Sequence, residues 1–229
     1  MTALRRLLAR ARRDEGVSLA ELLVAIMVFG IVLAVVSTTF VSLTKATAQA
    51  RFIDVNTRVA SNGLNDLSRT IRAARTIAQP GGTEASAFTL ATTESLTLTT
   101  AVNTADSLTT VPRRVTYRLE ADRTLSSSTV VATPLQTDFW QFTSPATKRA
   151  LGGTVVTAAS SGSPLFTYLD FTGKTLTPDA SGALTASQLP SIAAVTISLT
   201  IDRTSSMSSQ AVTLQNTVSL SNLAGGATT

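Results

Sequence analysis

The pattern of apolar and polar residues changes twice along this chain, and each part predicts a different structure. Between residues 22 and 44 no residue is charged. A helix that rises about 1.5 Å per residue needs about 20 apolar residues to cross about 30 Å of hydrocarbon. The first part of the pattern therefore predicts that residues 17–44 form the membrane-spanning half of a long helix.

Residues 45–79 keep a helical period, with apolar residues on one face of the helix and polar residues on the others. Their apolar residues recur mostly at threes and fours, and are Ile53, Ala60, Leu64, Leu67, Ile71, Ala74 and Ala78. A single apolar stripe predicts an amphipathic helix half that packs on a globular body. Gly63 predicts a local kink, because glycine is a poor helix former. Pro80, followed by two glycines, predicts the end of the helix.

Beyond residue 80 the period becomes alternating, as in β-strands. Val115, Tyr117 and Leu119 alternate with polar neighbours, and residues 194–201 alternate most clearly. Other strand candidates are residues 88–90, 96–98, 130–131, 139–142, 155–156, 165–169 and 212–220. Strands that follow one long helix predict an α+β fold, in which a long N-terminal spine helix packs on a mainly antiparallel β-sheet domain at residues 80–229.

Composition narrows the chemistry that this chain can perform. Cys and His are absent, which removes thiol nucleophiles, disulfides, Cys/His zinc sites and His-based triads. The acidic residues of the body show no paired spacing of the kind that glycosidases use. We therefore expect no enzyme activity, no catalytic residues, no cofactor and no metal.

Three features of the folded part have two interpretations each. Asp170, Gly173 and Asp179 could offer oxygen ligands to calcium, but Asp in turns more often bonds its own backbone. The aromatic run at residues 139–142 could form a carbohydrate or partner surface, but we expect core packing. The arginines between residues 51 and 75 could line a groove for DNA or an acidic partner, but we favour a solvated helix face.

Charged residues near the N-terminus predict the orientation of the helix in the membrane and single out Glu21. Five arginines against Asp14 and Glu15 place +3 of the net charge of +5 in residues 1–16, so the basic balance says little about nucleic acid. The positive-inside bias keeps this segment cytoplasmic and directs everything after about residue 45 outward. A carboxylate inside a membrane helix, such as Glu21, costs about 2.5–3.5 kcal/mol at the bilayer centre and therefore needs a cationic partner.

The stretch from Arg12 to Ala25 resembles the leader junction of type IV prepilins and type II secretion pseudopilins. It reads Arg-Arg-Asp-Glu-Gly-Val-Ser-Leu-Ala-Glu-Leu-Leu-Val-Ala. The resemblance implies that residues 1–16 are a basic leader, and that prepilin peptidase cuts between Gly16 and Val17 and methylates the new N-terminus. It also implies that the Val17 amine pairs with Glu21 of a neighbouring subunit during assembly.

Other positions refine the resemblance. Gly30 falls where many pilins carry a glycine that gives the helix flexibility. Val17 replaces the more frequent Phe or Met, and Thr38 stands where major pilins often have Pro. These departures favour a minor pilin or pseudopilin, and the order of residues 164–173 and 192–216 is similar to that of the GspJ/PilW-like group of minor pilins.

What the resemblance implies is a structural subunit with many partners. The protein would sit in the cytoplasmic membrane as a single-pass protein with its N-terminus inside, and then enter an extracellular pilus or pseudopilus. The implied partners are other pilin or pseudopilin subunits, prepilin peptidase, an assembly platform protein and an assembly ATPase. Nucleic acid is a partner only if the fibre serves DNA uptake.

Two simpler interpretations of the N-terminal segment stay open. An uncleaved signal anchor could hold a surface binding module or hydrolase, but it gives no reason for Glu21. An ordinary secretory signal peptide, with small-residue cleavage patterns at residues 46–48 or 48–50, would need an apolar core longer than the usual length of about 7 to 15 residues. A mature protein that begins at Val17 supports the prepilin interpretation, whereas a start at Met1 or Arg51 excludes it.

Overall fold

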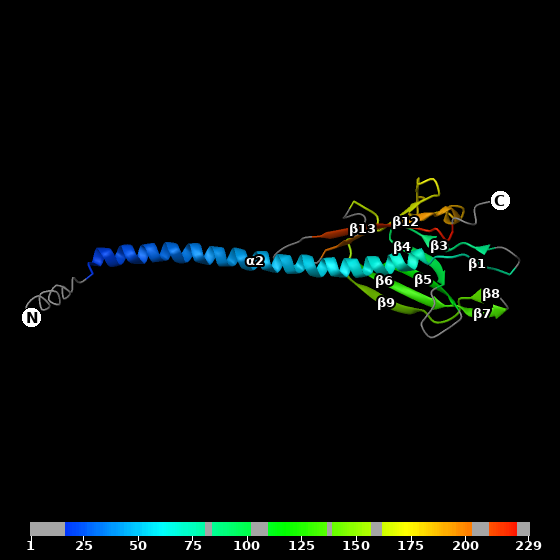
Figure 1. Cartoon of the computed structure of the whole chain (residues 1–229), viewed down its shortest axis with the longest axis horizontal. Coiled ribbons are helices and arrows are strands. Elements are labelled where there is room, and N and C mark those ends of the chain that lie inside the picture. Colours follow the sequence, from blue (N-terminus) through cyan, green and yellow to red (C-terminus); the bar gives the residue numbers. More distant parts are fainter. Residues whose placement is uncertain are drawn as a thin grey trace, which may run out of the picture. The chain divides into compact units, whose positions relative to one another are not determined.

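The computed structural model describes residues 17–80, 84–101, 110–136, 139–156, 162–202 and 211–223. The predicted leader, residues 1–16, lies outside the described residues. The chain divides into two compact units, one up to Gln49 and one from Ala50 onward. One long helix, α2 (Leu19–Arg72), begins in the first unit and ends in the second (Figure 1).

The second unit contains two larger sheets and two short hairpins. The five-stranded sheet has the order β3-β4-β5-β6-β9, and its strands are β3 (Phe88–Ala91), β4 (Ser95–Ala101), β5 (Pro112–Leu119), β6 (Thr124–Val131) and β9 (Thr147–Thr154). The four-stranded sheet has the order β11-β10-β12-β13, with β10 (Phe166–Leu169), β11 (Thr175–Leu176), β12 (Ala194–Ile201) and β13 (Val212–Ser219). The hairpins pair β1 (Ile77–Ala78) with β2 (Glu84–Ala85), and β7 (Thr133–Gln136) with β8 (Phe139–Gln141).

The predicted α+β fold is confirmed. Among the described strands every pairing is antiparallel. The last part of α2 lies alongside strands of both larger sheets (Figure 1), and one hydrophobic core joins the helix to them. The predicted apolar face of β12 is the centre of this core, since Val195, Ile197, Leu199 and Ile201 are each at most 1% exposed.

The helix ends at Arg72, earlier than residue 79 where the sequence pattern placed its end. Two contacts with distant segments explain the difference. The Asn222 side-chain amide donates to the carbonyl of Arg72 at 3.0 Å, and the backbone N–H of Arg75 donates to the carbonyl of Thr99 at 3.0 Å. These bonds satisfy backbone groups at the helix end and turn the chain onto the sheet edge before Pro80 is reached.

The buried face of α2 also differs from the predicted stripe. Ile53 is 38% exposed and Ala78 lies in β1, whereas Asn56 and Gly63 are buried. The helix continues as α-helix through Gly63, where a kink was predicted. A Cβ atom at Gly63 would stand 3.3 Å from Leu199 Cδ2, so the missing side chain lets the helix approach β12 closely.

Candidate functional site

The start of α2 is fixed by a hydrogen-bonded cap that includes Glu21. The backbone N–H of Glu21 donates to Ser18 Oγ at 3.2 Å, and the N–H of Leu22 donates to the carbonyl of Ser18 at 3.0 Å. Ser at the cap with Glu three residues later is the signature of a capping box. Hydrophobicity and charge alone did not single out Ser18, but this spacing is the signal that identifies it.

The predicted processing residues are accessible where the structure describes them. Val17 is 68% exposed and precedes the helix, and Glu21 is exposed in the first turn. A carboxylate in the first turn is also favoured by the helix dipole, by about 0.3–1 kcal/mol. Gly16 lies outside the described residues, so the roles of Gly16, Val17 and Glu21 in cleavage and assembly stay predictions.

The first part of α2 exposes a long apolar surface. Its large apolar side chains from Leu19 to Leu43 are between 50% and 82% exposed. An 18-residue window has a mean hydropathy of 2.9 and none of its residues is buried, so the helix is long and apolar enough to cross a membrane. Exposed apolar surface of this extent indicates contact with lipid or with other helices.

Three threonine hydroxyls of this segment are hydrogen-bonded within the helix itself. Thr38, Thr39 and Thr44 each donate a hydroxyl hydrogen bond to the carbonyl four residues earlier, at 2.9 Å. Such bonds let a hydroxyl enter apolar surroundings without water. At Gly30 an added Cβ would meet nothing within 4 Å, so no contact within the chain requires this glycine and its role in helix flexibility stays a prediction.

Residues 11–37 match the model of the prokaryotic N-terminal methylation motif. The motif spans the predicted junction at Gly16 and most of the apolar run. It indicates a type IV pilin-like protein that prepilin peptidase processes, and it supports assembly with other pilin subunits. Together, the methylation motif and the apolar helix fit a membrane-anchored pilin. No curated protein and no solved structure matches this chain.

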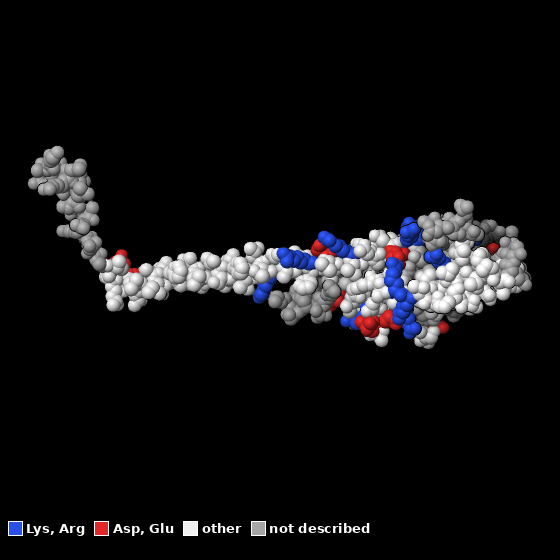
Figure 2. All heavy atoms as spheres, turned by 90° about the horizontal axis from the view of Figure 1, so that it is seen from below, with Lys and Arg blue, Asp and Glu red and all other residues white. Residues whose placement is uncertain are grey.

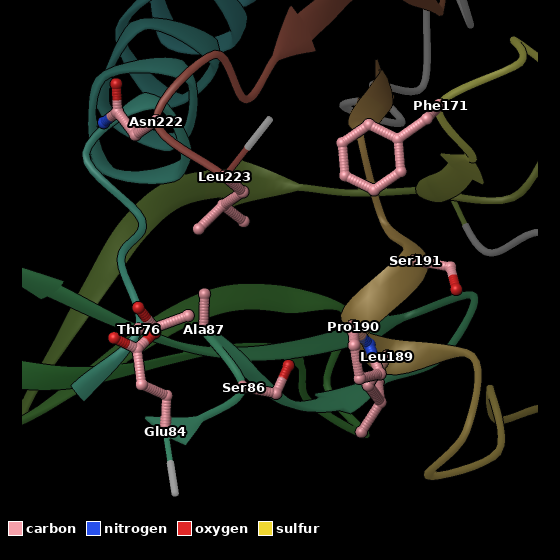
Figure 3. A pocket seen from close by; sticks show the side chains of 10 residues that line it. All are labelled: Thr76, Glu84, Ser86, Ala87, Phe171, Leu189, Pro190, Ser191, Asn222 and Leu223. Atoms are coloured by element: carbon pink, nitrogen blue, oxygen red, sulfur yellow. The ribbon is translucent and has the colours of Figure 1, made fainter. Parts of the chain in front are cut away.

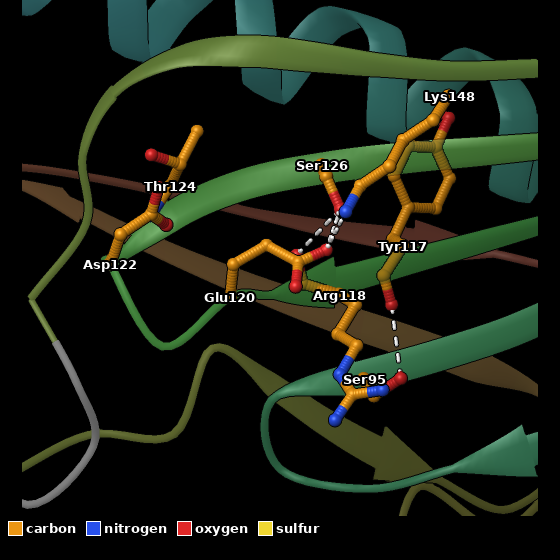
Figure 4. Close-up of polar contacts among 8 residues, drawn as sticks. All are labelled: Ser95, Tyr117, Arg118, Glu120, Asp122, Thr124, Ser126 and Lys148. Carbon is orange, nitrogen blue, oxygen red and sulfur yellow. Dashed lines mark hydrogen bonds and ion pairs between the residues drawn. The ribbon is translucent and has the colours of Figure 1, made fainter.

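In the second unit, Glu120 serves to tie strands together. Its Oε1 accepts a hydrogen bond from Ser126 Oγ at 2.6 Å and lies 2.8 Å from Lys148 Nζ (Figure 4). Lys148 and then Ser126 hold the pKa of Glu120 below its ordinary value. Because these contacts link the ends of β5, β6 and β9, the carboxylate has a structural use.

The two aspartates considered as calcium ligands are engaged by their own turns. Asp170 Oδ1 accepts from the hydroxyl and the backbone N–H of Thr172 and from the N–H of Lys174. Asp179 Oδ1 accepts in the same way from Ser181. These hydrogen bonds lower the pKa of both carboxyls. Within the described ranges, no three acidic side chains are grouped closely enough to hold a metal.

The aromatic residues of the β7–β8 hairpin do not join the core as expected. Phe139, Trp140 and Phe142 are half-buried and lie outside the hydrophobic core. The guanidinium of Arg114 instead stacks 4.1 Å from the centre of the Phe142 ring. The hairpin pairs its own two strands rather than extending either large sheet, and this explains why its rings remain at the surface.

A pocket of about 650 Å³ lies between the β1–β2 hairpin and residues 189–191 (Figure 3). Leu189, Leu223 and Phe171 contribute apolar walls. Among the described residues that line it, only Glu84 is charged, so the lining offers no pair of ionised groups for acid–base catalysis.

Proposed function

We propose that this chain is a minor type IV pilin or pseudopilin, a structural subunit rather than an enzyme. One observation carries the proposal: the methylation motif leads directly into a helix segment whose apolar side chains are exposed on every side. A soluble protein cannot keep such a surface in water, whereas a subunit that moves from membrane to fibre needs it in both places.

The proposed mechanism begins with cleavage after Gly16, which frees the α-amine of Val17. In the fibre, apolar helix halves of neighbouring subunits replace lipid around one another. The Glu21 carboxylate of one subunit then meets the Val17 amine of another in a low-dielectric setting, where the attraction between opposite charges is stronger than in water. Ser18 supports this pairing, because its cap fixes the helix start and with it the position of the carboxylate.

The finer assignments follow from the resemblance. The subunit would insert into the cytoplasmic membrane with its N-terminus inside and its β-rich unit outside. As a member of the GspJ/PilW-like group it would help to initiate the fibre or would lie at its tip. Its assembly would need a platform protein and an ATPase.

The N-terminus of the mature protein tests this proposal against an uncleaved signal anchor. Membrane-associated protein would be purified from the cells that make it, and its intact mass measured. We expect a mass that begins at Val17, with or without one methyl group. A mass that begins at Met1 would contradict the proposal and favour a surface binding module or hydrolase held by its anchor.

A matched pair of variants then tests the assembly role of the carboxylate. Glu21→Gln removes the charge and keeps the size of the side chain, and Ser18→Ala removes the cap but keeps the charge. We expect both variants to be cleaved, and incorporation into fibres to fall much further for Glu21→Gln. Equal incorporation of both, measured by immunoblotting of sheared fibres, would contradict the proposed ion pair.

A further inference from the structure

A second pocket, of about 410 Å³, opens between α2 and the five-stranded sheet. The helix contributes Asp66, Arg69 and Thr70, and the strands contribute Arg113, Tyr117 and Arg149 among others. The bond from the Tyr117 hydroxyl to Asp66 Oδ2, at 3.1 Å, shows that this face of β5 is turned toward the helix. Segments far apart in sequence therefore bring three guanidinium groups to one cavity.

Among the residues that the structure describes, an acidic side chain neutralises one of the three arginines. Arg149 Nη2 lies 2.9 Å from Asp66 Oδ1, and the other Asp66 oxygen accepts the Tyr117 hydroxyl. Among the described residues, neither Arg69 nor Arg113 forms a salt bridge with an acidic side chain. The described lining residues carry three positive charges against one negative charge, so two positive charges are unmatched among them. Figure 2 shows a band of basic side chains across one face of this unit, with acidic side chains at both ends of the band.

Arg113 brings a buried donor without a partner to this pocket. Its Nε atom is buried and makes no hydrogen bond within the described part of the chain. A buried N–H without a partner is costly, more so on a charged group. The hydroxyls of Ser127, Thr129 and Thr147 line the same cavity and can donate to oxygen atoms.

We propose that this pocket binds a phosphate group carrying two negative charges, either as free phosphate or as a small phosphate monoester. Guanidinium groups bind phosphate oxygens through paired N–H donors. A dianion balances the two unmatched charges, whereas a carboxylate or a nucleic-acid phosphodiester brings only one charge per group. The volume leaves room for a small organic substituent. The proposal is independent of fibre assembly, since every residue it uses lies in the second unit.

Isothermal titration calorimetry of the detergent-solubilised full chain, at constant ionic strength, tests the proposal. Inorganic phosphate, glycerol phosphate, acetate and a short oligonucleotide would be titrated separately. We expect saturable binding of one phosphate or one glycerol phosphate per chain, and at least tenfold weaker binding of acetate. Stronger binding of glycerol phosphate than of inorganic phosphate would identify a phosphate monoester as the ligand. Absence of saturable phosphate binding would overturn the proposal, and so would tighter binding of the oligonucleotide.

Matched variants locate the binding. Arg113→Gln and Arg69→Gln each remove one unmatched charge, and we expect each to weaken phosphate binding by about tenfold or more. Arg118→Gln is the control, because Arg118 is an exposed residue of β5 on the opposite face of the strand. Should Arg113→Gln fail to fold, Arg69→Gln at its exposed helix position decides alone. An effect of Arg118→Gln as large as that of Arg69→Gln would show general charge attraction and overturn the site.

Discussion

The two halves of α2 share one backbone geometry but differ in what surrounds their side chains. Leu33, in the first half, is 53% exposed, whereas Leu67, in the second half, is 0% exposed. The first half carries no charged residue between positions 22 and 44. The second half carries Asp54, Arg58 and Asp66, of which Asp66 reaches across to the sheet.

The two halves of α2 are specified by the sequence in two different ways. The first half is specified by its apolar composition, since many different apolar side chains are compatible with contact to lipid or to neighbouring helices. The second half is specified residue by residue, because protein interiors are close-packed. Gly63 lies close to Leu199, and Asp66 accepts hydrogen bonds from both Tyr117 and Arg149.

The largest difference is expected when the same apolar side chain is removed from each half. Leu67→Ala should lower the free energy of unfolding of the second unit by about 2–5 kcal/mol, because it leaves a cavity in a closed core. Leu33→Ala should leave that free energy unchanged. Urea unfolding in mild detergent, followed by the fluorescence of Trp140, measures both. Similar losses of unfolding free energy in the two variants would contradict the view that only the second half of α2 packs in the core.

A smaller difference is expected between the acidic residues. Asp66→Ala should cost about 1–3 kcal/mol, because it leaves the buried Tyr117 hydroxyl without its acceptor. Burial raises the pKa of Tyr117, so its hydroxyl remains a donor at neutral pH. Asp54→Ala should cost at most about 0.5 kcal/mol, since the Asp54–Arg58 pair lies in solvent. The same urea titration compares them, and an equal loss would show that the Asp66 contacts add nothing.

The smallest difference is expected between the two glycines of the helix. Alanine is favoured over glycine by about 1 kcal/mol in a helix interior. At Gly30 this gain meets no steric conflict, and the stability of the second unit should not change. At Gly63 the new methyl group must displace Leu199 within a packed core, so we expect a net loss of up to about 1 kcal/mol. A gain in Gly63→Ala would instead show that Leu199 can move aside at no cost.

Strand prediction gave the full bounds where the core face was apolar, but only the end of the strand where the core face was polar. β12 was predicted with its bounds, because four apolar residues alternate without interruption. Val130 and Val131 predicted a strand by their own propensity, yet the buried residues of β6 are Leu125, Ser126 and Ser127, and Val131 is 40% exposed. Serines can fill such positions because hydrogen bonds such as that from Ser126 to Glu120 satisfy them.

The N-terminal segment, with its methylation motif and its apolar run, can be identified from the sequence, because both signals consist of residues that follow one another along the chain. Tertiary structure alone decided that α2 ends at Arg72 and that Arg69 shares a pocket with Arg113. Both outcomes need contacts between segments distant in sequence, such as Asn222 with Arg72. Local periodicity carries no information about such contacts, since they arise only when the sheets close around the helix.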